Sequence, residues 1–153
     1  MKNFDKIKPK ILGVKFGKNC KLIDPVNLYG CTLGNSVFIG PFVEIQKNSR
    51  IGNHTRIQSH TFICEKVTIG KKCFISHGVM FVNDLMRSGK TNSNPKYFKK
   101  TTIGDNVTIG SNATILPVKI SNKIVVGAGS VVTKNLKIKG IYAGNPAKLI
   151  RKF

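Results

Sequence analysis

The feature that most constrains this chain is an aliphatic or aromatic residue that returns at every sixth position. The register begins at Leu33 and runs through Ile39, Ile45, Ile51, Ile57, Ile63, Ile69 and Ile75 to Phe81. It returns at Ile103, Ile109 and Ile115, and after a step shortened by one residue it continues through Ile120, Val126 and Val132. Six residues turn a helix through about 600°, so a helix would scatter these side chains around its axis, and a lone strand would not need glycine at the same phase of each repeat.

Two further positions of the repeat are also restricted. Glycine often follows the aliphatic residue, as at Gly34, Gly40, Gly52 and Gly70, and the fifth position is small or β-branched. A parallel β-helix explains all three features, because each unit is then one short strand plus a corner, with the aliphatic side chain inside. Glycine, or a residue that tolerates positive φ, suits the corner. Three units would close one triangular coil of about 18 residues.

We therefore predict an all-β parallel β-helix that occupies residues 1–153 as a single domain. A β-sandwich fits less well, because its strands alternate apolar and polar residues with turns every 8 to 12 positions or so. Residues 1–32 carry the repeat weakly and are expected to form the first coils. Two segments leave the register: a long loop at 83–102 and a tail at 142–153, in which 147–152 are expected to form a short basic helix. Long loops in compact domains usually serve function.

Composition indicates where the protein works in the cell and the redox state of its cysteines. The lysine-rich N-terminus contains no apolar run, and no stretch approaches the ~20 apolar residues of a transmembrane helix. We therefore expect a cytoplasmic protein. The four cysteines include no CxxC pair, and we interpret them as reduced, packed thiols.

The charge is strongly positive, with 26 Lys and Arg against 6 Asp and Glu, for a net charge of +20. Such an excess can attract nucleic acid, anionic membranes or small anionic ligands. The lysines are spread along the chain rather than gathered in one stripe or amphipathic helix. This distribution argues against a nucleic-acid partner and against a membrane partner. It leaves either a solvated basic surface or attraction of phosphate-bearing ligands, which salt would weaken.

The hexads, together with VVGAGSVVTKN (125–135) and YAGNPAKLIRK (142–152), resemble the left-handed β-helix acyltransferases of the hexapeptide-repeat group. The stretches FVEIQKN (42–48), IQSHTFICEKVTIG (57–70) and GVMFVND (78–84) are similar to nucleotide-sugar N-acetyltransferases, often acting at C3, of bacterial surface-glycan and O-antigen synthesis. The resemblance implies a left-handed coil, acetyl-CoA as co-substrate and no metal. It also implies a homotrimer whose active sites lie between subunits, with the loop folded over the nucleotide-linked amino sugar.

The chemistry that this resemblance implies is attack of a neutral amine on a thioester. The protein must orient the amine, accept its proton and stabilise the oxyanion. His60 and His77 are candidate bases because imidazole titrates near neutral pH, although either could be an idle corner residue, as we expect for His54. The resemblance places Asn83 beside the sugar amine; the alternative is an Asx turn at the loop entry.

Further candidates concern substrate and cofactor. Arg87 could hold a phosphate or a sugar acid, although Met86 precedes it where relatives often have proline. The remaining substrate-binding candidates are Asp84, Glu44, Gln46 and Gln58. For coenzyme A we expect small residues near pantetheine and adenine, and cations near its phosphates: Ser111, Gly127, Ala128 and Gly129, with Lys134, Lys148 and Arg151.

Other functions remain possible on the same fold. An O-acetyltransferase of serine or a simple sugar would differ only in the acceptor pocket. A zinc protein similar to the γ-class carbonic anhydrases needs three converging histidines, but His60 and His77 are 17 positions apart and do not stack in register. A non-catalytic scaffold or nucleic-acid binder would need a basic stripe with exposed aromatic residues. The sequence does not identify the sugar, the nucleotide (UDP or dTDP) or the acylated position.

Overall fold

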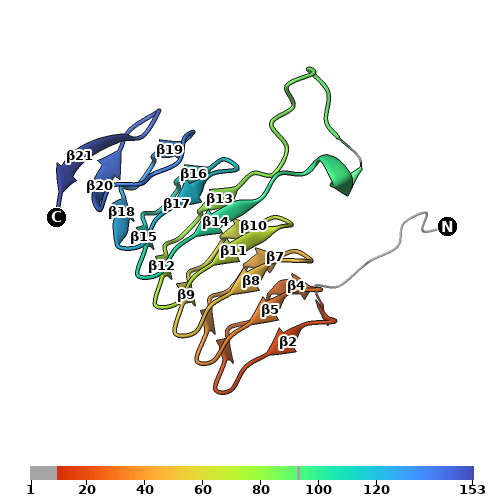
Figure 1. The fold of residues 1–153 in the computed structure, drawn as a ribbon. Helices are drawn as coiled ribbons and strands as arrows, with labels where there is room; N and C mark the ends of the chain where they lie inside the picture. Colours follow the sequence, from red (N-terminus) through yellow and green to blue (C-terminus); the bar gives the residue numbers. More distant parts are fainter. Residues whose placement is uncertain (1–9, 93) are drawn as a thin grey trace.

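A computed structural model describes residues 10–92 and 94–153, which coil into a triangular prism of parallel β-strands (Figure 1). Three sheets form its faces, and the chain visits them in the order A, B, C in each coil. The strands are mostly two or three residues long, as the sixfold repeat predicts. This parallel β-solenoid is the predicted left-handed β-helix, and the predicted fold class is confirmed.

Each face is a stack of strands from successive coils. Face A contains β1 (Ile11–Leu12), β4 (Asn27–Tyr29), β7 (Glu44–Ile45), β10 (Phe62–Ile63), β13 (Met80–Phe81), β16 (Thr114–Ile115) and β19 (Val131–Val132). Face B contains β2 (Lys15–Phe16), β5 (Thr32–Leu33), β8 (Arg50–Ile51), β11 (Val67–Ile69), β14 (Thr101–Ile103) and β17 (Lys119–Ile120). Face C contains β3 (Lys21–Leu22), β6 (Phe38–Ile39), β9 (Arg56–Ile57), β12 (Phe74–Ile75), β15 (Thr108–Ile109), β18 (Ile124–Val126), β20 (Gly140–Ala143) and β21 (Lys148–Lys152).

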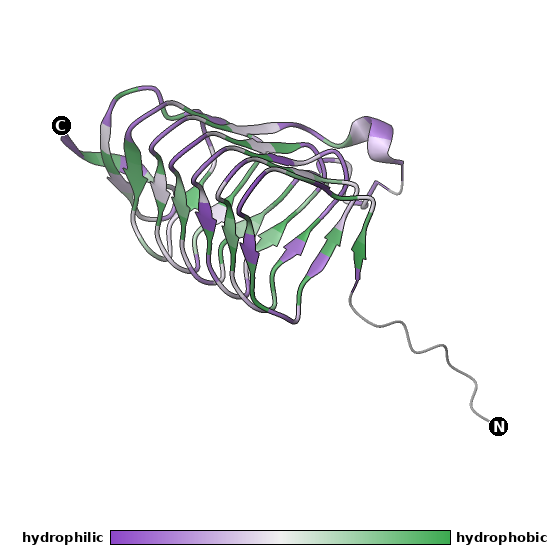
Figure 2. Ribbon diagram, turned by 90° about the horizontal axis from the view of Figure 1, so that it is seen from below, coloured by the Kyte–Doolittle hydropathy of each residue, from purple (hydrophilic) through white to green (hydrophobic). Residues whose placement is uncertain are grey.

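The register of the sheets reproduces the repeat. Ile45 pairs with Ile63 on face A, Ile51 with Ile69 on face B, and Ile57 with Ile75 on face C. In each of these pairs the partner comes three full repeats later in the chain. Thr102 instead pairs with Lys119, one position short of three repeats, because the step after Ile115 is shortened. Figure 2 shows that hydrophobic residues follow the strands while much of the corners and of the protruding loop is hydrophilic.

The core consists of the ladder of aliphatic side chains inside the prism. The sixfold residues from Leu33 to Val132 are at most 3 % exposed. Polar residues at the fifth position are tolerated because their hydroxyls donate to a carbonyl of the next coil. Ser49 Oγ donates to the Cys64 oxygen at 2.8 Å, and Thr55 Oγ1 donates to the Gly70 oxygen at 2.8 Å. Such bonds offset the cost of burying a hydroxyl.

The glycine that follows the aliphatic residue is required by space rather than by positive φ. A Cβ on Gly52 would lie 2.5 Å from the carbonyl carbon of Gly70, directly above it, so any side chain would collide with backbone. The left-handed conformation occurs two residues later, for example at His54, His60 and Lys66, whose φ values are 59°, 60° and 67°. The sequence expectation that glycine supplies the positive φ is thus wrong at Gly52.

Two segments depart from the coil. The loop occupies residues 82–100, between β13 and β14, and contains one short 3₁₀ helix, η1 (Pro95–Tyr97); it projects beyond the prism (Figure 1). The predicted C-terminal helix is wrong: Lys148–Lys152 form strand β21, antiparallel to β20. β20 is the last parallel strand of face C, and pairing with β21 satisfies backbone groups that a helix would leave exposed at that edge.

Candidate functional site

The predicted histidines lie on one edge of the prism, the C–A corner. We use this name for residues 40–43, 58–61, 76–79, 110–113 and 127–130, which connect face C to face A in successive coils. His60 and His77 occupy adjacent coils, while His54 lies on the corner between faces B and C. The corner is a regular backbone ladder: Gly78 N donates to the Ser59 oxygen at 3.0 Å, and Asn112 N donates to the His77 oxygen at 2.9 Å.

His77 is the better placed of the two as a proton acceptor. Its Nδ1 lies 2.8 Å from Ser59 Oγ, one coil below, and its ring is exposed. A hydroxyl held at Nδ1 fixes the ring orientation and leaves Nε2 free to face an incoming group. His60 is also exposed, but its ring stacks on Phe42 with the centroids 4.8 Å apart and an interplanar angle of 17°. That contact fits a corner histidine with no catalytic role. The sequence alone did not distinguish His60 from His77.

Most of the residues expected at coenzyme A lie further along the same corner. Ser111 Oγ is 2.7 Å from Ser76 Oγ, and Gly127, Ala128 and Gly129 form the next corner. No atom lies within 4 Å of the position that a Cβ on Gly129 would take, so this corner is open to a ligand. The expected phosphate-binding cations do not join this group: Lys134 lies on the A–B side of the last coil. Lys148 and Arg151 lie on β21.

The expected acceptor residues on face A form a fixed polar cluster. Glu44 accepts hydrogen bonds from Asn27 Nδ2 and Gln46 Nε2, both at 2.9 Å, so both of its carboxylate oxygens are held. Burial raises the pKa of the nearby Tyr29, and the charges of Glu44 and then Glu65 raise it further. Gln58 lies apart, where β9 enters the C–A corner.

The loop residues lie at the opposite edge of face A. Asn83 donates to the Glu65 oxygen at 3.4 Å, and its own carbonyl accepts from Lys99 N at 2.8 Å, which closes the base of the loop. Asp84 accepts from Asn92 N at 2.6 Å and Met86 N at 2.9 Å, and these bonds hold the pKa of its carboxyl below the usual value. The carboxylate of Asp84 is therefore already engaged in shaping the loop.

Lys66 was not among the sequence candidates, yet it fastens the loop to the prism. Its Nζ donates to the Pro95 oxygen at 2.5 Å and to the Phe98 oxygen at 3.2 Å. The loop and the strand edge then enclose a cavity of about 650 Å³. Its lining includes the cations Arg87, Lys99 and Lys100 and the ring of Tyr97. Nothing in the local sequence around Lys66 indicates this contact, because its partners lie far along the chain, beyond the start of the loop.

Face A separates the two groups of candidates within one chain. The histidines lie on the edge that face A shares with face C, and the loop leaves from the edge that it shares with face B. Large apolar side chains remain exposed on faces C and A and at the corner between them. Phe74 is 37 % exposed, Met80 41 % and Phe42 57 %. Among the described residues, no three His, Cys, Asp or Glu side chains gather as a metal site, and no helix is long and apolar enough to cross a membrane.

Comparison with known proteins agrees with this architecture. Residues 30–65 match the family model described as bacterial transferase hexapeptide (six repeats), and residues 100–134 match the model for the hexapeptide repeat of succinyl-transferase. The chain belongs to the hexapeptide-repeat transferase family. The predicted family is confirmed at this level, and the narrower nucleotide-sugar group remains a proposal.

Three relatives illustrate the range of the family. The bifunctional protein GlmU of Neisseria meningitidis serogroup A is 38% identical over 106 residues, which are 69% of this chain and 21% of that protein. The chain therefore spans about a fifth of the length of that curated relative. A hexapeptide-repeat acetyltransferase from Vibrio cholerae, solved with acetyl coenzyme A, has a TM-score of 0.67 and 25% identity, with 80% of this chain and 70% of that chain covered. Soybean serine acetyltransferase, solved with serine, has a TM-score of 0.59 and 33% identity over 71% of this chain and 42% of that chain.

Proposed function

We propose that the protein is an acetyl-CoA-dependent N-acetyltransferase whose acceptor is the amino group of a nucleotide-linked amino sugar in the cytoplasm. The family and the acetyl-CoA complex of the Vibrio cholerae neighbour support the cofactor. The loop cavity is the observation that supports this choice of acceptor, because Arg87, Lys99 and Lys100 line it together with Tyr97. Guanidinium and ammonium groups bind phosphates, and an aromatic ring can stack on a nucleobase. A serine or a simple sugar offers neither a phosphate nor a nucleobase to these groups.

The proposed division of labour follows the geometry of the two edges. Acetyl-CoA lies along the C–A corner, where Ser111 and Ala128 have small side chains and Gly129 leaves room close to the backbone. The loop, with Asn83 and Arg87, holds the acceptor, and Glu44 and Gln46 on face A bind sugar hydroxyls. His77 Nε2 accepts the proton of the amine as it attacks the thioester carbonyl, and the coenzyme A thiolate leaves.

Because the two edges of one chain lie on either side of face A, the complete site needs a second copy. The exposed Phe74, Met80 and Phe42 support packing of faces A and C between copies. Burying apolar area contributes roughly 25 cal/mol per Å². A homotrimer assembled in this way sets face A of one subunit, with the loop at its edge, opposite face C of its neighbour.

Thiol release tests the proposal. Purified protein is mixed with acetyl-CoA and a panel of UDP- and dTDP-linked amino sugars, beside serine and maltose as hydroxyl acceptors. We expect release with an amino-sugar nucleotide, a loss of about 10²-fold or more in kcat for His77→Ala, and a smaller change for His60→Ala. Release only with serine or maltose would establish the O-acetyltransferase alternative, which the soybean enzyme's likeness favours.

A further inference from the structure

Face B carries a row of cations and hydroxyls from one end of the prism to the other. The outward residues pair from strand to strand in the order Lys15, Thr32, Arg50, Thr68, Thr102 and Lys119. All six are exposed. At the usual strand spacing of about 4.8 Å, the row is ~24 Å long. No aromatic or acidic side chain interrupts it.

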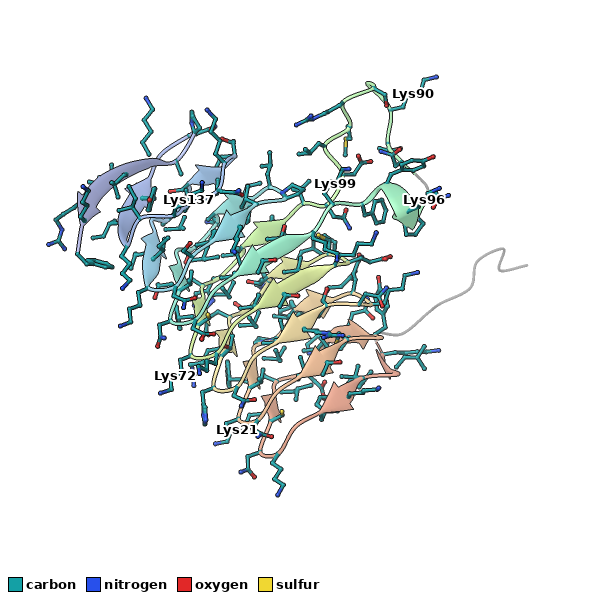
Figure 3. The ribbon with its side chains drawn as sticks, in the orientation of Figure 1. Lys21, Lys72, Lys90, Lys96, Lys99 and Lys137 are labelled. Carbon is teal, nitrogen blue, oxygen red and sulfur yellow. The ribbon has the colours of Figure 1, made fainter. Side chains whose placement is uncertain are left out.

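Lysines border this row on both sides. The A–B edge carries Lys47, Lys66, Lys99, Lys100 and Lys134. The B–C edge carries Lys18, Lys71, Lys72, Lys123, Lys137 and Lys139. Figure 3 shows Lys99 and Lys72 at opposite edges of this face and Lys137 toward its C-terminal end. These residues are dispersed in the sequence, but each turn of the coil returns the chain to the same side.

The opposite side of the prism lacks such charge. Neither the seven strands of face A nor the C–A corner contains a lysine or arginine. Among the described residues, most of the positive charge therefore lies on face B and its edges, and face C carries Lys21, Arg56 and, on β21, Lys148, Arg151 and Lys152. The expectation that the lysines form no stripe is wrong in three dimensions. Because the expectation of no membrane partner rested on it, that second expectation loses its support.

The basic side chains of face B are largely free of carboxylate partners. In the described part of the chain, the acids at its two edges are Glu65, 3.6 Å from Lys47, Asp105, 3.9 Å from Lys71, and Asp84, whose carboxylate accepts from Met86 N and Asn92 N within the loop. Two shallow hollows of the face are each lined by three cations and no acid. One, of about 390 Å³, is lined by Arg50, Lys66 and Lys100, and the other, of about 470 Å³, by Lys119, Lys137 and Lys139.

We propose that face B docks the protein on a bilayer that contains anionic lipids, with lipid phosphates received in the two hollows. Three parallel rows of cations make a plane rather than a line, and a bilayer surface is the anionic partner that is itself flat. Each Lys or Arg near an anionic bilayer contributes about 1 kcal/mol to binding. The row lacks large apolar side chains, so attachment is electrostatic and reversible.

Nucleic acid fits this face less well. Single strands are bound on aromatic platforms, and no aromatic residue stands in the outward row. A duplex is read by a helix or ribbon in a groove, and its backbone curves away from a flat sheet. Face B stands apart from the histidine corner. Lys100 lines both the loop cavity and the first hollow, so the test removes Lys15, Arg50 and Lys119, none of which lines the loop cavity. In the proposed trimer face B would point outward.

Vesicle co-sedimentation tests the proposal at 0.15 M salt. The probes are vesicles of phosphatidylcholine with about one-third phosphatidylglycerol, and vesicles of phosphatidylcholine alone. The variant Lys15→Thr/Arg50→Thr/Lys119→Thr extends the threonines already present in the same row. The control Lys10→Thr/Lys21→Thr/Lys152→Thr removes the same charge outside face B and its edges. Equal melting temperatures establish that both remain folded, and the single variant Arg50→Thr serves if the triple variant does not fold.

We expect binding to the anionic vesicles only. The face-B triple variant should lose about 100-fold in partition coefficient and Arg50→Thr about fivefold, whereas the control triple should change only a few-fold. Equal losses for both triples would overturn the proposal, because net charge rather than face B would then be responsible. Absence of binding to anionic vesicles would overturn it too. So would displacement from vesicles by a short DNA duplex at matched phosphate concentration, which would assign the face to nucleic acid.

Discussion

Lys66 is the single side chain that we expect to contribute most to holding the loop closed against the prism. Its ammonium bonds the Pro95 and Phe98 carbonyls, while Lys72, six residues later, has the same left-handed backbone with φ of 55°. Substituting Lys66 by alanine removes two charge-assisted bonds. Bonds of this kind contribute about 1.5 to 3 kcal/mol each, but the lysine is half-buried and one bond is 3.2 Å long. We therefore take about 1 to 2 kcal/mol for the pair.

This free energy stabilises the closed loop, so Lys66→Ala should raise the open population about 5- to 30-fold. Trypsin cleaves after Arg87 and Lys90 in the loop, and its rate follows that population when reclosing is fast. We expect loop cleavage to accelerate by about tenfold and the acceptor KM to rise by a similar factor, with the KM for acetyl-CoA within about twofold. Lys72→Ala is the matched control and should resemble wild type. Equal cleavage of both variants, or an unchanged acceptor KM, would refute this account of the loop.

Three further predictions concern the coil and the loop. Ile63 is fully buried in the ladder, so Ile63→Ala should lower the free energy of unfolding by about 2 to 5 kcal/mol and Tm by roughly 5 to 15 °C. The exposed Thr68→Ala is the control and should stay near the wild-type Tm. Calorimetry measures both, and a shift for Ile63→Ala below about 2 °C would contradict a core built on this ladder. Burial raises the pKa of Cys31 to about 11 and of Cys64 to about 12, so a disulfide reagent at pH 8 should label the partly exposed Cys20 first; equal labelling of Cys64 would show that it is not buried. Hydrogen bonds from Asn92 and Met86 lower the pKa of Asp84, so the carboxylate's stabilisation of the loop is present above the unfolded pKa of 3.8 and is lost as pH falls through the lower folded pKa. Hydrogen exchange of the loop amides, divided by the intrinsic rate, should therefore stay level from about pH 7 to 4 and accelerate below that range. Acceleration between about pH 7 and 5 would contradict this cause.

The coil could be predicted from the sequence because its constraint is local and repeated. The residue types of Ile57 and Gly52 recur in a fixed phase, and that phase matches one strand and one corner of the coil. The tail could not be predicted in the same way. The segment around Leu149 is compatible with a basic helix by composition, but the unpaired edge of β20 offers backbone partners that only the assembled prism shows. Tertiary pairing then overrides local propensity.

For the candidate site, the sequence suggests residue types but does not give their geometry. His77 and His60 look alike in sequence, yet Ser59 orients one and Phe42 stacks on the other. Lys66 was missed because its partners lie in the loop, far along the chain. The basic face was missed because dispersal in sequence was taken for dispersal in space, although successive coils bring Arg50 and Thr68 side by side.

The central claim is that this protein transfers acetyl to nitrogen on a nucleotide-linked sugar. The most direct measurement is the product of acetyl-CoA with the amino-sugar nucleotide that releases thiol, analysed by mass spectrometry before and after mild alkaline treatment. An amide survives that treatment and an ester does not. The account predicts one added acetyl group that is stable to base and that forms about 10²-fold more slowly with His77→Ala. A base-labile acetyl group, or acetylation only of hydroxyl acceptors, would contradict it.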